Sequence, residues 1–533
     1  MTNAVEITDL HVSISGSHVL QGVSFSVPSG GVTALLGRNG VGKTTTLRAI
    51  LGLVASSGRI QVLGDEVSGW PTHRVVRLGI GYVPEDRDVF SGLTVEQNLR
   101  LAESGSGAQY DEVFSLFPEL KTRGRQRAGT LSGGQQQMLS IARALLNHRP
   151  LLLIDEPSKG LAPKIVSEFA GVLERAAEHA TVLLVEQNLS VVKASRPTHC
   201  RARPRRGRAP RGGRRPRGPD SRATTPGSGR GRVNIFLVLT FSGVALGAIY
   251  FLAASGLSLI YGLMDVLNFA HGLFMTLGAY AGYEIATRLP SSLGAPTLVI
   301  LAIMGATVVG ALAAGVTELI LIRPLYGKPI SQILITIGLD LAGVGLLMGG
   351  FGSTALQIPV PLWLIEPTHI GGLYLPNASF LAIGAGVLVL IGLEMFLALT
   401  RYGIIIRAGV ENREMVRALG IDVGRAFTLV FVIGGAMAGL AGILYTIVFS
   451  GDLVSPNQGD SLLIFAFIVV VIGGLGSIRG SAVAALVVGL LQQYTSFYIG
   501  GHSGWAQIGD LSTVLLLALV LEWRPRGLFG RVA

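Results

Sequence analysis

The sequence predicts a multidomain protein in which an α/β domain is followed by an all-α domain that crosses a membrane several times. Two observations on the 533 residues predict this division. Residues 1–195 combine mixed charge with short apolar runs, as soluble α/β domains do. Residues 233–533 consist of long apolar runs separated by short polar breaks, and roughly 20 apolar residues are enough to cross a bilayer.

The first domain contains a glycine-rich loop between a strand expected at 31–36 and a helix expected at 44–51. The loop, from Gly37 to Thr44, fits the phosphate-binding pattern G-x-x-x-x-G-K-S/T. Backbone N–H groups at a helix N-terminus attract phosphate, the lysine adds a point charge, and the terminal hydroxyl can bind Mg²⁺. The alternative is a glycine-rich turn with a solvated lysine. The residues expected to hold a nucleotide in this loop are Gly37, Asn39, Gly40, Gly42, Lys43, Thr44 and Thr45.

Two adjacent carboxylates, Asp155 and Glu156, follow an apolar run at 151–154 that is expected to be a buried strand. The end of such a strand lies at the carboxyl edge of the sheet, beside the phosphate loop. Asp155 is therefore a candidate Mg²⁺ ligand, and Glu156 is the candidate general base for an attacking water. Two solvated carboxylates at a strand end are the alternative.

A third motif, Leu131-Ser132-Gly133-Gly134-Gln135, lies between these two and precedes a predicted helix. Alone it would be a glycine-rich turn. The three motifs in this order, within about 120 residues, resemble the ATP-binding cassette (ABC) family. The resemblance implies an ATP hydrolase that forms a head-to-tail dimer of two ABC domains. In such a dimer Ser132, Gly133, Gly134 and Gln135 would meet the γ-phosphate of ATP bound by the opposite domain.

Finer detail resembles one branch of that family, the high-affinity branched-chain amino acid importers. Glu85, in Gly81-Tyr82-Val83-Pro84-Glu85, stands where most ABC domains have a glutamine, and the resemblance implies contact with nucleotide and Mg²⁺. Gln187 stands where most relatives have a catalytic switch histidine, which implies a lower hydrolysis rate. Ile14 replaces an aromatic residue that would stack on adenine.

Residues 196–232 form a linker with 13 arginines, six prolines, seven glycines and one acid. The rest of the chain holds 30 basic and 31 acidic residues, so the net charge of +11 belongs to this linker and does not indicate a nucleic-acid partner. Because the linker has no Leu, Ile, Val, Phe or Met to bury, we expect it to be disordered.

Three interpretations of the linker remain open. It is a polybasic tether to anionic lipid, an arginine-rich RNA-binding arm, or out-of-frame translation after a frameshift that joined two neighbouring genes. We favour the third. A shifted frame over 196–206 can encode a typical continuation of an ABC domain, and Val233 resembles a GTG start codon read internally. The ABC domain would then be truncated near residue 195.

The second domain is oriented by its basic loops. Arginine and lysine occur around Arg323, between Arg401 and Arg425 and near the carboxyl end, which predicts that these segments and the first domain are cytoplasmic. Nine full spans would place Val233 outside, so one segment is expected to be broken or re-entrant, either 264–288 or 511–522. The nine apolar runs lie near 235–262, 264–288, 296–322, 330–357, 379–400, 426–450, 461–477, 480–499 and 511–522.

Three motifs of this domain resemble the permease of the same importers: Asn268-Phe269-Ala270-His271-Gly272, 473–480 and 525–530. Polar residues at membrane depth are costly, so Asn268 and His271 are candidates for the translocation path, with helix–helix hydrogen bonding as the alternative. The segment 407–421 resembles the coupling helix that docks into an ABC domain, which makes Glu411, Asn412 and Gly420 candidate coupling residues.

The resemblance covers about 1–193 and 233–533. It implies ATP- and Mg²⁺-dependent import of branched-chain or related amino acids across a bacterial inner membrane, with the ATPase domain cytoplasmic. The implied partners are a second ABC subunit, a second permease subunit and a periplasmic or lipid-anchored substrate-binding protein. Two alternatives stay open, a nonproductive frameshift fusion and an importer of urea or short amides.

Overall fold

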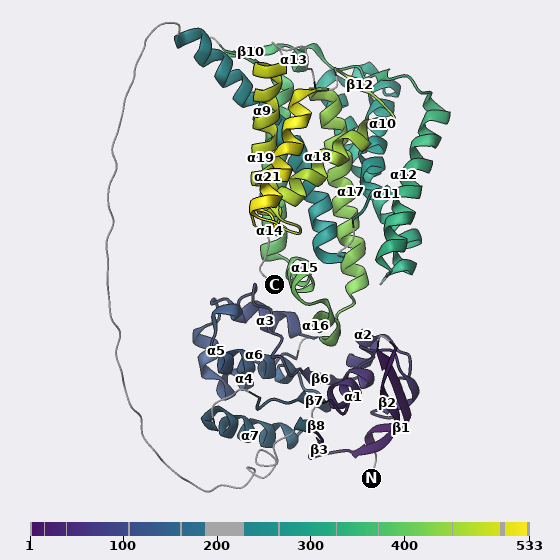
Figure 1. The fold of residues 1–533 in the computed structure, drawn as a ribbon, viewed down its shortest axis with the longest axis vertical. Coiled ribbons are helices and arrows are strands. Elements are labelled where there is room, and N and C mark those ends of the chain that lie inside the picture. The colour runs from purple at the N-terminus through teal and green to yellow at the C-terminus, as the bar shows by residue number, and fades with distance from the viewer. Residues whose placement is uncertain are drawn as a thin grey trace, which may run out of the picture. The chain divides into compact units, whose positions relative to one another are not determined.

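The structure is a computed structural model whose described residues fall into two compact units (Figure 1). The first unit comprises residues 1–231 together with 414–421, and the second comprises 232–413 together with 422–533. The described residues are 3–14, 16–38, 40–104, 107–159, 163–186, 229–264, 267–326, 328–370, 373–449, 451–500 and 507–529. Asn39, Gln187 and most of the linker at 196–232 lie outside them.

The first unit contains two four-stranded sheets. One is antiparallel, in the order β2-β1-β4-β5, and the other is parallel, in the order β3-β8-β7-β6. Strands β6, β7 and β8 are buried at every position, which explains why they read as continuous apolar runs. The strands are β1 (Asn3–Ile14), β2 (Ser17–Pro28), β3 (Val32–Leu36), β4 (Ser57–Val62), β5 (Asp65–Glu66), β6 (Ile80–Val83), β7 (Leu151–Asp155) and β8 (Thr181–Glu186).

Helices α3 to α7 of the first unit pack with the parallel sheet around one apolar cluster that includes Leu99, Leu139, Leu152 and Leu184. Capping boxes fix the starts of two of them, with Thr94 before α3 and Ser132 before α6. The helices are α1 (Lys43–Ile50), α2 (Thr72–Val76), α3 (Val95–Ala102), α4 (Tyr110–Leu116), α5 (Pro118–Thr122), η1 (Ala128–Thr130), α6 (Gly133–Leu145) and α7 (Pro163–Ala177).

Over its described residues, the second unit is helical apart from four short strands and the loops between elements. The α/β unit followed by an all-α polytopic unit confirms the predicted fold class. The strands are β9 (Leu356–Gln357), β10 (Pro367–Ile370), β11 (Leu373–Pro376) and β12 (Leu453–Val454). The helices are α9 (Gly229–Met264), α10 (His271–Arg288), η2 (Ser291–Leu293), α11 (Ala295–Thr317), η3 (Glu318–Ile322), η4 (Arg323–Leu325), α12 (Pro329–Phe351), α13 (Leu362–Ile365), α14 (Asn377–Leu399), α15 (Arg401–Glu411), α16 (Arg413–Ala418), α17 (Val423–Val448), α18 (Gln458–Gly473), α19 (Ile478–Thr495), η5 (Ser496–Gly500) and α21 (Ile508–Trp523).

Among the described residues, six helical segments are long and apolar enough to cross a membrane: 234–264, 295–325, 329–351, 377–399, 423–448 and 478–500. The run expected at 461–477 forms the shorter apolar helix α18. The run at 264–288 is not one continuous helix, because α9 extends to Met264, residues 267–270 are not helical, and α10 begins at His271. The run at 511–522 forms the continuous helix α21.

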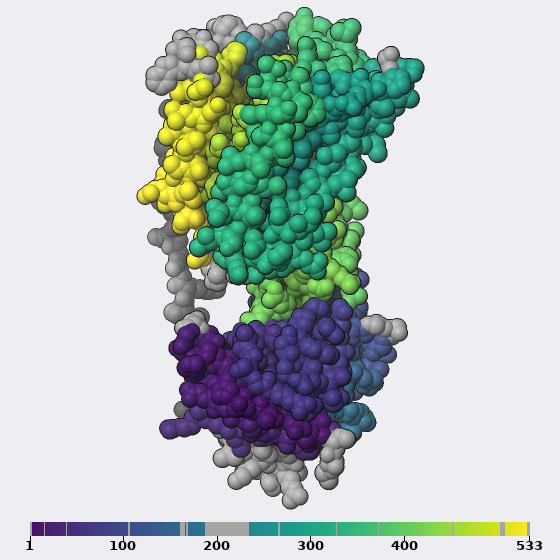
Figure 2. Space-filling view, turned by 90° about the vertical axis from the view of Figure 1, so that its right-hand side faces the viewer, coloured from purple at the N-terminus to yellow at the C-terminus, as the bar shows by residue number. Residues whose placement is uncertain are grey.

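Glycines bring α10, α11 and α17 into close contact. A methyl group added at Gly439 of α17 would lie 2.2 Å from the carbonyl oxygen of Ala306 in α11, and one added at Gly442 would lie 2.0 Å from that of Met275 in α10. Helices α12 and α14 instead expose much of their apolar surface, including Ile330 and Leu388. The residues coloured as 330–400 form a broad outer face of this unit (Figure 2).

Candidate functional site

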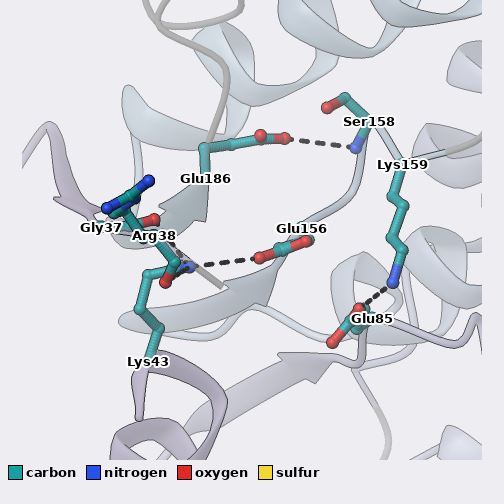
Figure 3. Close-up of polar contacts among 8 residues, drawn as sticks. All are labelled: Gly37, Arg38, Lys43, Glu85, Glu156, Ser158, Lys159 and Glu186. Atoms are coloured by element: carbon teal, nitrogen blue, oxygen red, sulfur yellow. Dashed lines mark hydrogen bonds and ion pairs between the residues drawn. The ribbon is translucent and has the colours of Figure 1, made fainter. Parts of the chain in front are cut away.

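The phosphate loop lies between β3 and α1, and its lysine is held inside it. Lys43 is only 7% exposed, and its Nζ donates to the carbonyl oxygens of Gly37 (2.9 Å) and Arg38 (3.1 Å) (Figure 3). The loop enters α1 through Gly42, whose φ of 91° favours glycine. The Lys43 ammonium group therefore stands at the loop with backbone partners that a phosphate can replace.

Glu156 follows directly after β7 and contacts the same lysine. Its carboxylate lies 3.4 Å from Lys43 Nζ, and both side chains are more than nine-tenths buried (Figure 3). The backbone at Glu156 has a φ of 42°, an uncommon conformation for a residue with a side chain. Its N–H donates to the carbonyl oxygen of Val185 at 2.9 Å, so the parallel pairing of β7 with β8 fixes this turn.

Asp155 is fully buried, and neither of its carboxylate oxygens has a hydrogen-bond partner within the described part of the chain. Burial raises its pKa to about 6, and the negative charges of Glu85 and Glu156 add to this effect, while Thr44 and Lys43 oppose it. A buried carboxylate without partners, near a threonine hydroxyl, provides the oxygen ligands that Mg²⁺ prefers. The donor set of Asp155 and Thr44 thus fits a Mg²⁺ ion.

Two further contacts lie beside these residues, and neither was predicted from the sequence. Lys159 forms an ion pair with Glu85, and the Ser158 N–H donates to Oε1 of Glu186 at 3.3 Å (Figure 3). Glu186 is buried at the end of β8, one strand from Asp155. A carboxylate at the end of an apolar strand was the signal that could have identified it, as it identified Asp155.

The LSGGQ residues form the start of α6. Ser132 Oγ accepts from the Gln135 N–H at 3.4 Å, and Gln135 Oε1 accepts from the Ser132 N–H at 3.1 Å. Gln135 also donates to Glu119 of α5 at 2.8 Å. A methyl group at Gly133 would lie 2.5 Å from Arg87, so the helix start is closely covered. The hydrogen bonds between Ser132 and Gln135 fix the N-terminal turn of the 13-residue helix α6 before any ligand binds.

The candidate translocation residues lie where α10 begins. Asn268 is 3% exposed, and neither amide atom has a hydrogen-bond partner among the residues that the structure describes. His271 is fully buried, and its Nε2 lies 3.0 Å from the carbonyl oxygen of Ala253 in α9, which matches the helix–helix alternative for this side chain. The two residues thus differ in degree: His271 uses Nε2 in a helix–helix contact and leaves Nδ1 without a partner among the described residues, whereas neither amide atom of Asn268 has one.

The candidate coupling residues surround α16. Glu411 ends α15, Asn412 has an extended backbone, and Gly420 has a φ of 83°. Residues 414–421 belong to the first unit. Within that unit Glu414 forms an ion pair with Arg48 of α1, and a methyl group at Gly420 would lie 3.1 Å from Val76 of α2.

The phosphate loop, the paired carboxylates and the ordered LSGGQ helix define the first unit as an ABC-type ATPase, and the second unit is a multi-pass membrane domain. Comparisons with known proteins agree. Residues 20–159 match the family described as ABC transporter, and residues 239–521 match the branched-chain amino acid transport system / permease component family. The chain belongs to the latter family over its membrane domain, preceded by an ABC transporter ATP hydrolase domain.

Two relatives come from Pseudomonas aeruginosa. The high-affinity branched-chain amino acid transport ATP-binding protein BraG is 47% identical over 176 residues, which are 32% of this chain and 76% of the relative. The permease protein BraD of a system with the same description is 30% identical over 302 residues, 56% of this chain and 96% of the relative. A crystal structure of a nucleotide-free ATP-binding cassette is 25% identical, covers 36% of this chain and 84% of its own, and gives a TM-score of 0.33.

Proposed function

We propose that this chain is an ATPase–permease fusion that drives the import of branched-chain amino acids across the bacterial inner membrane, with its ATPase domain cytoplasmic. The observation that carries the proposal is the joining in one chain of an ordered nucleotide site with a membrane domain that matches a branched-chain amino acid permease family. The named functions of BraG and BraD support this substrate class.

Lys43 performs the first step of the proposed cycle. Its ammonium group exchanges the carbonyl oxygens of Gly37 and Arg38 for the β- and γ-phosphate oxygens of ATP, while the loop N–H groups orient the phosphates. This exchange also separates Lys43 from Glu156. Without the Lys43 charge beside it, the Glu156 carboxylate then acts on water.

Glu156 acts as the general base. Its carboxylate accepts a proton from the water that attacks the γ-phosphorus, the bond from that phosphorus to the bridging oxygen breaks, and ADP and phosphate result. Asp155 and Thr44 would hold Mg²⁺, which when bound offsets the negative charge of the phosphates. Gln187, outside the described residues, would take the place of the switch histidine with a weaker contact to the γ-phosphate.

Coupling to the membrane domain would pass through 407–421. The ion pair of Glu414 with Arg48 and the packing of Leu419 against the apolar cluster of the ATPase support this assignment. The LSGGQ helix would serve ATP bound by a second ABC subunit. A second permease subunit and an external substrate-binding protein complete the proposed assembly.

Uptake of labelled leucine tests this function. The chain is expressed with the neighbouring transporter subunits and a binding protein in cells that lack their own leucine importers, and a Lys43→Ala variant serves as the inactive control. We expect leucine uptake that depends on Lys43. Uptake of urea or acetamide instead would replace the substrate assignment, and the absence of uptake for every substrate would favour a nonproductive fusion.

The frameshift proposal for 196–232 has a separate test. Resequencing the locus shows whether an open overlapping frame runs across codons 190–232, and the intact mass of the purified protein shows whether one chain is made. A single uninterrupted frame with no overlapping frame would refute the frameshift and leave a native linker.

A further inference from the structure

Glu318 is a fully buried carboxyl group of the second unit that neither the nucleotide site nor the translocation residues use. Both of its oxygens accept hydrogen bonds from hydroxyl groups. The Tyr326 hydroxyl donates to Oε1, and the Thr428 hydroxyl donates to Oε2 at 2.6 Å. The carboxyl group thereby joins the end of α11 to the residue that follows η4 and to the first turns of α17.

Stability alone gives a weak reason for a buried acid at this place. Helices α11 and α17 are already in direct contact through Gly310 and Gly435, where a methyl group on Gly435 would lie 2.3 Å from the Gly310 carbonyl oxygen. Replacing a buried polar cluster by apolar residues often leaves the protein no less stable. What the hydroxyl pair adds is a directional contact, which exists in one relative position of the two helices and breaks in another.

The backbone at Glu318 is irregular in a way that allows such a shift. Glu318 is the first residue of the π-helical turn η3, which interrupts the helix between α11 and η4. Single π-helical turns inside α-helices occur frequently at functional sites. Beyond this turn Pro324 prevents a regular α-helical continuation, so Arg323–Leu325 forms the short element η4 and Tyr326 follows it.

A continuous set of contacts links Glu318 to the proposed coupling segment. The Tyr326 ring packs edge-on against the Phe427 ring, with 4.9 Å between centroids. The Arg413 guanidinium lies over the same Phe427 ring at 5.1 Å, and it donates to the Leu263 carbonyl oxygen at 2.8 Å. Arg413 is part of 407–421, and Leu263 is in the last turn of α9. All of these residues belong to the second unit.

We propose that Glu318 is a positioning residue that passes a displacement of the segment 407–421, through Arg413, Phe427 and Tyr326, to the membrane helices α11 and α17. The inference rests on the proposed function, because it assigns a role in coupling ATP hydrolysis to transport. Its physical content is a hydroxyl–carboxyl contact that is made in one state of the transporter and released in the other.

The test compares Glu318→Gln and Thr428→Val in the complete transporter reconstituted in proteoliposomes. Thr307→Val is the matched control, because Thr307 is in α11 and its hydroxyl bonds only the Ile303 carbonyl oxygen among the described residues, as Thr428 bonds that of Gly424. We measure substrate moved per ATP hydrolysed, and the midpoint of thermal unfolding reports stability.

We expect each of the two variants to lower the transport-to-hydrolysis ratio by roughly threefold to thirtyfold, with ATP hydrolysis retained. The double variant should lose little more than either single one, and Thr307→Val should keep the ratio. An unchanged ratio would overturn the inference, as would a parallel fall of uptake and hydrolysis with a lower unfolding midpoint. If the unaltered transporter moves no substrate, the proposed function fails instead and this inference fails with it.

Discussion

The ATPase unit buries charged groups, whereas the core of the membrane unit formed by α10, α11 and α17 is held by glycines. In the ATPase, Lys43, Asp155 and Glu156 are each less than a tenth exposed, and Asp155 has no hydrogen-bond partner in the described structure. In the membrane unit, Gly439 and Gly442 allow backbone to touch backbone. The nucleotide site holds buried charged groups that a ligand can contact, whereas α10, α11 and α17 pack through backbone contacts that depend on glycine.

The nucleotide site and the glycine contacts are sensitive to different kinds of substitution. Burial of the Asp155 carboxylate, which Thr44 and Lys43 offset only in part, destabilises the ligand-free ATPase, so ligand binding recovers free energy at that site. Close backbone contacts in a membrane depend on shape, and a single added methyl group disturbs them. The nucleotide site should therefore respond mainly to charge substitutions, and the glycine contacts of α10, α11 and α17 mainly to volume substitutions.

The largest expected effect is on Glu156. Replacing it by glutamine removes the base but keeps the size of the side chain, so ATP hydrolysis should fall by at least about 100-fold. Nucleotide affinity, measured by binding of a fluorescent ATP analogue, should persist. Glu112→Gln, at an exposed position of α4, is the control. Undiminished hydrolysis in Glu156→Gln would remove this residue from the catalytic role.

A volume change in the glycine core comes next. Gly442→Ala would place a methyl group 2.0 Å from the Met275 carbonyl oxygen, and should destabilise the membrane unit by about 3 kcal/mol. Thermal unfolding in detergent measures this. Gly384→Ala in α14, where the added methyl group meets nothing within 4 Å, should have little effect. Equal behaviour of the two variants would refute the contrast between the units.

Asp155→Asn should raise stability, whereas Gly442→Ala lowers it. Removing the buried negative charge should stabilise the nucleotide-free ATPase by about 2 kcal/mol while weakening Mg²⁺-dependent ATP binding. Chemical denaturation and nucleotide titration with and without Mg²⁺ separate the two effects. The exposed Asp111→Asn is the control. A destabilised Asp155→Asn protein would show that the carboxylate already has a compensating partner.

The smallest effect is expected at Lys159. Its ion pair with Glu85 is more than half exposed on the lysine side, and such pairs contribute about 1 kcal/mol or less. Lys159→Met should free Glu85 and tighten Mg²⁺–ATP binding by no more than about fivefold, measured by titration. Lys121→Met should leave the affinity unchanged. Weaker binding in Lys159→Met would mean that Lys159 itself contacts the nucleotide.

The sequence predicted the strongly patterned parts well. The phosphate loop, the buried strand β7 and the helix after Ser132 each have a local signature, because a few adjacent residues determine them. Contacts between residues far apart in the chain could not be predicted from the sequence. Nothing near Lys159 indicates Glu85 as its partner, since 74 residues separate them. The membrane spans were predicted as apolar runs, but composition could not show that α9 ends at Met264 or that α11 continues through a π-helical turn.

That π-helical turn has a consequence for how this helix tolerates insertion and deletion. Such a turn accommodates one residue more than an α-helical turn, and each residue of an α-helix rotates the chain by about 100°. Deleting one residue within 319–322 would let this turn close into α-helical form as far as η4, and it would turn Tyr326 away from Glu318 by about that angle. The spacing between Glu318 and Tyr326, and not only the identity of the two residues, is therefore what holds their hydrogen bond together.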